Sequence, residues 1–480
     1  MTAQVAIVHG WSDSSKSFYD LRDFLSASGY SATEIWLTDY VSMADEVRVE
    51  DVAKRMDAVI NAAIAEGRLT KPFDLIVHST GGLVAREWLS RYYPNGKNAG
   101  GIDAPVKRLL ILAPANFGSK LASMGKRMVG RVIKGWDSWF QTGTEMLASL
   151  ELASSYQWEL ARRDLLKADG GAGESPYGRD KVWPFVIVGS RGYQDGLHEI
   201  VNEDGSDGTV RPAAANLNAI GVTIDFSKSA APAVIGWGSR SDIRFPFAVL
   251  PDRDHTAIHQ PTEKSGAADE FSNRLADLIL EALRCDTADR YAEVAVNWDS
   301  VSEETAKLSQ SDEEMRDAFD GNPPSSQALH QYMQIVLFVR DDFGRPVDDY
   351  FLEFFSPQQD DDAEVVYFHR SVIDDVHVNG AEASRRCLFI DRTDLMTGFY
   401  PLIVDPEKRV VLVSLSAAEP GPNVRYFDST QTGAKGSIAI HQENDDRREA
   451  LGVACLRRNT THLVEIVIPR QPISSVFSMA

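Results

Sequence analysis

The first 290 residues alternate short apolar runs with helical patterns, and this alternation constrains the fold more than any other feature of the chain. The amphipathic stretch VEDVAKRMDAVINAAIAEG is one of the helical segments. The runs typical of buried strands are QVAIVHG, ATEIWL, FDLIVHS, RLLILAP, WPFVIVGS and FPFAVLP. Strands that take turns with helices form a mostly parallel sheet with helices on both faces. We therefore predict an α/β domain over residues 1–290.

The C-terminal part has a different pattern. The polar residues 300–328 indicate a linker with one short helix. Short strand-like runs follow, separated by Gly, Pro, Asp and Asn: QIVLFVRDD, YFLEFFSP, EVVYFHRSV, RCLFID, YPLIVD, RVVLVSLS, SIAIH and LVEIVIP. Such spacing is typical of antiparallel sheets. For residues 329–480 we predict an accessory domain with the fold of an antiparallel β-sandwich.

Charge is distributed unevenly between these two parts. The 480 residues carry a formal net charge of −21, of which −6 belongs to residues 1–290 and −15 to the rest. A protein this acidic is repelled by nucleic acid, so we expect no nucleic-acid partner. With 43% hydrophobic and 25% charged residues, the composition is that of a globular protein able to form sizeable cores.

The cysteines and the apolar runs indicate in which cellular compartment the protein is expected. Cys285, Cys387 and Cys455 lie far apart, which favours a reducing environment over a disulfide framework or a zinc site. The first strand-like run begins almost at the N-terminus, so we expect no signal peptide. No run reaches 18 apolar residues, so we expect no transmembrane helix. The expected location is the cytoplasm, or another compartment reached after export by a non-Sec route.

A serine follows the third apolar run, in the phrase HSTGGLVAR. Ser79 lies between a predicted buried strand and a predicted helix, with Gly81 and Gly82 close behind. This arrangement is typical of a nucleophile elbow, a tight turn that exposes a serine hydroxyl above the sheet. The usual pattern is G-x-S-x-G, and here Val77 replaces the first glycine. The alternative is an ordinary turn with a serine that caps the helix.

Three further features fall where a serine hydrolase needs them. Asp207, in GSDGTVR, and His255, in DHTAI, each follow a predicted strand, and Asp204 and His259 compete with them locally. The order Ser, Asp, His is that of the α/β-hydrolase triad. The phrase HGW after the first strand places Trp11 where its backbone N–H, with that of Thr80, would form an oxyanion hole.

These motifs resemble those of the lipase branch of the α/β-hydrolase superfamily, which includes bacterial lipases and lecithin-cholesterol acyltransferase-like and GPI-inositol deacylase-like groups. The resemblance rests on HGW, HSTGGLVAR, LAPANFGS, GSDGTVR and DHTAI, and spans about residues 4–285. It implies an α/β-hydrolase fold with a helical cap. It also implies that Ser79 is the nucleophile, His255 the general base and Asp207 the acid that orients His255. For the C-terminal part we recognise no family.

More than sixty residues separate LAPANFGS from WPFVIVGS, so residues 119–180 are the candidate cap or lid. An apolar stripe with helical spacing runs along its first part, and we expect it to bind substrate: Met124, Met128, Val132, Trp136 and Phe140. Five basic residues accompany the stripe: Lys120, Lys126, Arg127, Arg131 and Lys134. The pattern suits a helix lying on an anionic membrane surface, or a cap helix packed on its own domain.

The C-terminal part offers little chemistry. Asp341-Asp342 and Asp360-Asp361-Asp362 could ligate calcium, but acidic runs are usually solvated loops and no known calcium-loop spacing is present. We expect no metal site, and regard this part as a candidate for binding a protein partner.

The sequence as a whole predicts a serine hydrolase that cleaves carboxylic esters of lipids, a lipase or phospholipase, through an acyl-enzyme. Such chemistry needs no metal or organic cofactor. Two alternatives stay open. The same triad serves amidases, thioesterases and acyltransferases, and Val77 leaves room for an inactive hydrolase fold that only binds.

Overall fold

The structure is a computed structural model in which two compact units are distinguished. Unit 1 consists of residues Met1–Leu165, Gly173–Asn218 and Arg240–His330, and unit 2 of Leu166–Ala172, Ala219–Ser239 and Gln331–Ala480. The structure describes residues 4–10, 15–30, 35–38, 44–128, 143–168, 173–194, 202–227, 232–265, 267–319, 324–355, 366–403, 405, 411–426, 438–440, 457–477 and 479.

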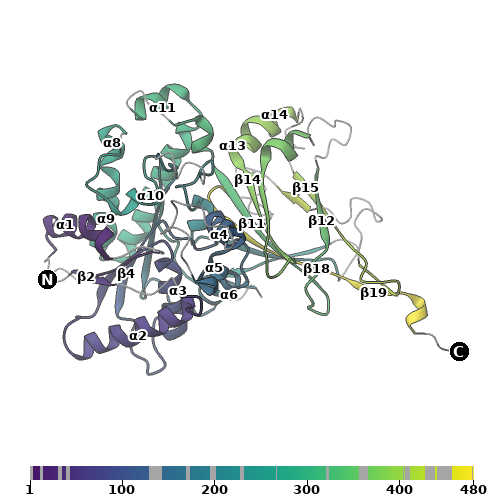
Figure 1. The fold of residues 1–480 in the computed structure, drawn as a ribbon, viewed down its shortest axis with the longest axis horizontal. Coiled ribbons are helices and arrows are strands. Elements are labelled where there is room, and N and C mark those ends of the chain that lie inside the picture. The colour runs from purple at the N-terminus through teal and green to yellow at the C-terminus, as the bar shows by residue number, and fades with distance from the viewer. Residues whose placement is uncertain are drawn as a thin grey trace. The chain divides into compact units, whose positions relative to one another are not determined.

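Unit 1 is built on a six-stranded parallel sheet (Figure 1). Its strand order is β10-β6-β4-β3-β1-β2, and every neighbouring pair is parallel. The strands are β1 (Val5–Val8), β2 (Ile35–Thr38), β3 (Phe73–His78), β4 (Val106–Leu112), β6 (Trp183–Gly189) and β10 (Phe247–Leu250). These are the six apolar runs of the N-terminal part, so the predicted parallel sheet is confirmed.

Helices cover both faces of this sheet. On one face, α1 (Tyr19–Ala27), α9 (Arg274–Arg284) and α10 (Ala288–Leu308) share a single core with the strands. On the opposite side lie α2 (Val49–Ala65) and α3 (Gly81–Tyr92), as Figure 1 shows. The amphipathic pattern of residues 49–65 and the helical spacing after Ser79 are thus both confirmed as helices.

The described residues of the long insertion between β4 and β6 form three helices. They are α4 (Lys120–Met128), α5 (Thr144–Leu150) and α6 (Ser155–Asp164). Shorter helices of unit 1 are η1 (Ser15–Phe18), α7 (Pro212–Ala215), η4 (Ala257–His259), α8 (Asp269–Ser272), α11 (Asp312–Ala318) and η5 (Ser326–Leu329).

The boundary between the units differs from the predicted domain limits. Helix α10 runs through residue 290, and its Trp298 is fully buried in the core of unit 1. Residues 300–318, expected in a linker, belong largely to α10 and α11. Conversely, β7 (Ile220–Asp225), from the middle of the N-terminal part, pairs with β18 of unit 2.

Unit 2 contains a six-stranded sheet in the order β13-β14-β11-β18-β7-β8 and a three-stranded antiparallel sheet, β12-β15-β17. The larger sheet mixes antiparallel pairs with two parallel ones, β11–β18 and β18–β7. One core cluster contains side chains from both sheets. The strands are β8 (Ala233–Gly236), β11 (Tyr332–Asp341), β12 (Tyr350–Phe355), β13 (Ile373–Val378), β14 (Arg385–Asp391), β15 (Val411–Ala417), β17 (Ile438–Ile440) and β18 (Thr461–Ile468).

Two predicted strands of the C-terminal part are helical instead. The run EVVYFHRSV contains the π-helical η6 (Phe368–Val372), and YPLIVD begins with α14 (Tyr400–Leu402). Phe368 and Val372 are both buried, four residues apart on one helical face. A short apolar run does not distinguish a buried helical turn from a strand, which explains the error.

Smaller strand pairs complete the described secondary structure. They are β5 (Leu166–Lys167) with β9 (Gly238–Ser239), and β16 (Val424–Tyr426) with β19 (Arg470–Pro472). The short helices of unit 2 are α13 (Arg392–Asp394), η7 (Leu395–Phe399) and η11 (Ser474–Val476). Within the ranges that the structure describes, no helix combines the length and apolar character needed to cross a membrane.

Candidate active site

Ser79 occupies a strained turn at the end of β3. Its φ of +51° lies in the left-handed region, which costs a non-glycine residue of the order of 1–3 kcal/mol. Two backbone hydrogen bonds hold the turn, from Ser79 N to Leu112 O (2.9 Å) and from Gly82 N to Ser79 O (3.0 Å). Helix α3 begins two residues after Ser79. The strand, the strained serine and the helix form the geometry of a nucleophile elbow.

The structure also explains how Val77 is tolerated in place of glycine. A Cβ on Gly81 would lie 3.4 Å from the Val77 Cβ, an ordinary van der Waals distance, but only 3.1 Å from the His9 carbonyl oxygen. A side chain at position 81 would therefore clash with the backbone after β1 rather than with Val77 in β3. Val77 itself is fully buried in the sheet. The departure from the usual motif leaves the turn intact.

A chain of hydrogen bonds joins Ser79, His255 and Asp207. The Ser79 Oγ lies 3.0 Å from His255 Nε2, and His255 Nδ1 lies 2.8 Å from Asp207 Oδ2. Because a carboxylate only accepts, Nδ1 carries the proton toward Asp207 and Nε2 is left to accept from the serine hydroxyl. All three residues are buried. Residues separated by up to 176 positions thus form the arrangement that activates a serine.

The Asp207 carboxylate is fixed by its own loop. Its Oδ1 accepts hydrogen bonds from the backbone N–H groups of Thr209 (2.9 Å) and Val210 (2.7 Å). The backbone N–H of His255 donates to the Asp207 carbonyl oxygen at 2.8 Å. With Oδ1 held in this way, Oδ2 has one orientation available, toward His255.

His78, which the sequence reasoning did not single out, contacts both the backbone and the ring of His255. Its Nε2 donates to the His255 carbonyl oxygen at 2.9 Å, and its ring centroid is 4.8 Å from that of His255. Burial, followed by the neighbouring His255 and His259, holds the pKa of His78 well below its usual range. A neutral His78 therefore supports the backbone of His255 without adding a charge. The only signal for it in the sequence is its position next to Ser79.

The competing residues lie elsewhere. Asp204 is exposed, and its carbonyl oxygen accepts from Arg211 Nε at 3.1 Å. The His259 ring packs against Phe18, with centroids 4.5 Å apart. Of the two expected oxyanion donors, Thr80 is fully buried at the start of α3, and Trp11 lies outside the described residues.

The predicted lid residues are described only in part. Met124 is half-buried on α4, and Met128 ends that helix, without a described side chain. Val132, Trp136 and Phe140 lie outside the described residues.

Asp341, weighed as a calcium ligand, is occupied by its own turn. Its Oδ1 accepts from the backbone N–H groups of Phe343 (3.0 Å) and Arg345 (2.9 Å), and its Oδ2 lies 3.7 Å from Arg470 Nη1. Asp360, Asp361 and Asp362 lie outside the described residues.

Comparison with known proteins agrees with this geometry. The family model described as "Alpha/beta hydrolase family" matches residues 5–264. No curated protein sequence matches the chain.

Solved structures with similar folds include the phospholipase PlaB from Legionella pneumophila. It shares 24% identity and a TM-score of 0.76 with this chain, over 100% of this chain and 96% of that one. The same phospholipase in complex with thio-NAD gives a TM-score of 0.74 at 24% identity, over 99% and 96% of the two chains. The mature Bacillus licheniformis lipase BlEst2 matches with a TM-score of 0.36 and 16% identity, over 54% and 87%. The likeness to PlaB extends through unit 2, so it shows a common fold for the whole chain.

Proposed function

The chain belongs to the alpha/beta hydrolase family, and we propose that it is a serine hydrolase that cleaves carboxylic esters of lipids. The observation that carries the proposal is the hydrogen-bonded chain from Ser79 Oγ through His255 to the buried Asp207, with Ser79 on a strained elbow. A serine is a weak nucleophile without an adjacent base, and a histidine needs an acid partner to keep its tautomer. Both conditions are met here.

The proposed reaction has two steps. Ser79 attacks the acyl carbonyl while His255 Nε2 takes its proton, and the backbone N–H of Thr80, with that of Trp11, holds the oxyanion. His255 then gives the proton to the leaving alkoxide, which leaves an acyl-enzyme on Ser79. Water, deprotonated by His255, attacks the acyl-enzyme and releases the fatty acid, and the proton returns to Ser79. Asp207 orients His255 and stabilises the imidazolium that forms.

A lipid substrate is supported by two observations. The likeness in fold extends over 96% of the chain of a phospholipase. The sequence between β4 and β6 carries an apolar stripe beside a group of basic residues in an otherwise acidic protein. A basic amphipathic segment binds an anionic lipid surface through both its apolar face and its charge. We therefore propose long-chain lipid esters, rather than small soluble esters, as the preferred substrates.

Labelling with a fluorophosphonate probe tests the proposed chemistry. The wild-type protein should be labelled, and both Ser79→Ala and heat-denatured protein should not. A panel from short soluble esters to phospholipid vesicles, with products identified by mass, then tests the bond that is cleaved. Release of fatty acid supports the proposal. A wild-type protein that stays unlabelled, or that cleaves amides or thioesters in preference to esters, would contradict it.

Charge reversal tests the role of the basic segment. Replacing Arg127, Arg131 and Lys134 by glutamate should weaken binding to anionic vesicles at least tenfold, because each basic residue near such a surface contributes about 1 kcal/mol. Cleavage of a short soluble ester should be unchanged. The matched control reverses Lys54, Arg55 and Lys71, three exposed basic residues elsewhere in unit 1, and should leave vesicle binding nearly unchanged. Equal effects of the two triple variants would reject a local lipid contact.

A further inference from the structure

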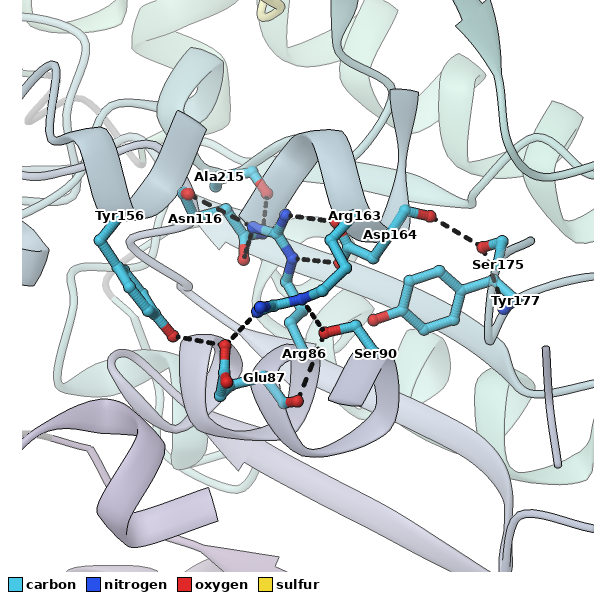
Figure 2. Close-up of polar contacts among 10 residues, drawn as sticks. All are labelled: Arg86, Glu87, Ser90, Asn116, Tyr156, Arg163, Asp164, Ser175, Tyr177 and Ala215. Atoms are coloured by element: carbon cyan, nitrogen blue, oxygen red, sulfur yellow. Dashed lines mark hydrogen bonds and ion pairs between the residues drawn. The ribbon is translucent and has the colours of Figure 1, made fainter. Parts of the chain in front are cut away.

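A network of buried and partly buried polar side chains connects helix α3 with α6 and neighbouring loops (Figure 2). Arg86, two turns along α3 from Ser79, is fully buried and pairs with the equally buried Asp164 at the end of α6. Its Nε donates to Asp164 Oδ2 at 2.8 Å and its Nη2 to Oδ1 at 3.0 Å. A pair of parallel hydrogen bonds of this kind fixes the plane of the guanidinium group.

The remaining nitrogen of Arg86 contacts Asn116, in the loop after β4. Arg86 Nη1 lies 3.3 Å from both the carbonyl oxygen and the Oδ1 of Asn116. At its other end, Asn116 Nδ2 donates to the carbonyl oxygen of Ala215 at 2.7 Å. Figure 2 shows the Asn116 amide between the guanidinium group and Ala215. One amide side chain therefore links the helix that follows Ser79 to α7, which follows the loop of Asp207.

Two more hydrogen bonds connect the same two loops. The backbone N–H of Phe117 donates to Ala214 O at 2.9 Å, and Ser119 Oγ donates to Thr209 O at 2.6 Å. Thr209 in turn donates its own N–H to the Asp207 carboxylate. The loop after β4 thus holds the Asp207 loop at both ends.

Helix α3 and the loop after β4 pass each other with no free space. A Cβ on Gly82 would lie 2.9 Å from the Pro114 Cβ and 3.0 Å from Ile111 Cγ2, distances that a real side chain does not reach without displacing a neighbour. A displacement of the loop after β4 relative to α3 would therefore move both α3, which begins beside Ser79, and Asp207.

The other half of the network makes no such link. The fully buried Glu87 accepts hydrogen bonds from Arg163 and from Tyr156 OH (3.2 Å), and Arg163 also donates to Ser90 Oγ at 3.0 Å. These bonds join α3 to α6 alone. They offer a control within the same pair of helices, built on the partly buried Tyr156 and Arg163.

We propose that Asn116, held by Arg86, is a positioning residue that sets the distance between the nucleophile helix α3 and the loop of Asp207. It acts through Asp207 and contacts neither substrate nor reacting atoms. The inference rests on the proposed function, because it assigns a role in the same reaction. A misplacement of about 1 Å at a catalytic group costs on the order of 10²-fold in rate.

The test uses Asn116→Asp in the full chain. Aspartate keeps the size of asparagine and its contact with Arg86, but has no N–H to donate to Ala215. We expect kcat for a soluble ester to fall about 10- to 100-fold, with KM within about twofold of wild type. Tyr156→Phe, the control, should leave kcat within about twofold. If Asn116→Asp does not fold, Ser119→Ala removes the bond to Thr209 instead and should lower kcat about threefold to tenfold.

A double-mutant cycle with Asp207→Asn separates positioning from a merely structural role. If Asn116 acts through Asp207, Asn116→Asp should change kcat less than about twofold once Asp207 is replaced. A structural defect would lower the rate by the same factor in both backgrounds, and that result would overturn the proposal. An unchanged kcat in Asn116→Asp or, where that variant does not fold, in Ser119→Ala would also overturn it. Failure of the wild-type protein to be labelled by fluorophosphonate would instead overturn the proposed function, and this role with it.

Discussion

At the scale of single residues, the turn at Ser79 depends on neighbouring glycines, which have no side chain, as well as on the backbone hydrogen bonds that hold it. The serine keeps a positive φ because β3, β4 and α3 all hold its backbone, and neighbouring positions leave room for the turn. Gly10 is the tightest of these positions. A Cβ there would lie 2.6 Å from the Ser79 Cβ and 2.9 Å from His78 Nδ1.

We predict that Gly10→Ala displaces Ser79 and lowers the fluorophosphonate labelling rate at least tenfold, since a shift of about 1 Å at a nucleophile has effects of this order or larger. Rates should be measured on protein whose circular dichroism matches the wild type. Gly421→Ala is the matched control, because a Cβ at Gly421 meets nothing within 4 Å. A labelling rate in Gly10→Ala equal to that of the control would show that the turn adapts.

Ser79, Asp207 and His255 could be singled out from the sequence because each follows an apolar run, in the order typical of the α/β-hydrolase fold. His78 and Asn116 could not. Their contacts are made to His255 and Ala215, 177 and 99 positions away, and neither contact leaves a periodic pattern. Residue type and spacing suggest chemistry, but they carry little information about the partner that supports it.

At the scale of elements, α10 extends from Ala288 to Leu308, past residue 290, the predicted end of the α/β domain. Its last part, from residue 300 onward, is polar, and this suggested the start of a linker. Its buried face includes Tyr291, Val294 and Trp298, at spacings of three and four residues. The same difficulty applies to β7, whose run IGVTID was overlooked because its partner strand, β18, lies some 240 residues further along the chain.

Trp298→Ala should therefore destabilise unit 1. The Trp298 ring is fully buried, and its centroid lies 5.7 Å from that of the Phe185 ring. Its Nε1 donates a hydrogen bond to Glu281 at 2.9 Å. Loss of a buried tryptophan costs about 3–5 kcal/mol in the free energy of unfolding. Urea unfolding should be followed both by circular dichroism and by the urea concentration at which Ser79 labelling is lost.

Val296→Ala serves as the comparison on the same helix, because Val296 is 63% exposed. Its effect on the free energy of unfolding should stay within about 0.5 kcal/mol. A Trp298→Ala protein with the urea midpoint of Val296→Ala would mean that α10 is an appendage rather than part of the core.

At the scale of the whole molecule, the two units are interleaved along the chain. Strands β7 and β8 come from residues 220–236, between two segments of unit 1, yet they complete the six-stranded sheet of unit 2. Val222, Ile224 and Phe226 are buried in the core of unit 2. The last 150 residues alone would therefore lack part of this apolar core and β7, one of the two strands that pair with β18.

A fragment of residues 331–480 is predicted to self-associate, because the eight-residue β18 would become an edge strand with unpaired backbone groups. Joining residues 219–239 to its N-terminus through about 20 Gly/Ser residues, which reach about 25 Å on average, should give a monomer with a cooperative thermal transition. Size-exclusion chromatography and circular dichroism measure both properties. The same fusion with Ile224→Asp should behave like the bare fragment, because a carboxylate replaces a side chain that is only 6% exposed. A bare fragment that is monomeric and has the same melting temperature as the fusion would contradict this prediction. Strands β7 and β8 would then be dispensable for the sheet, and unit 2 would begin at residue 331.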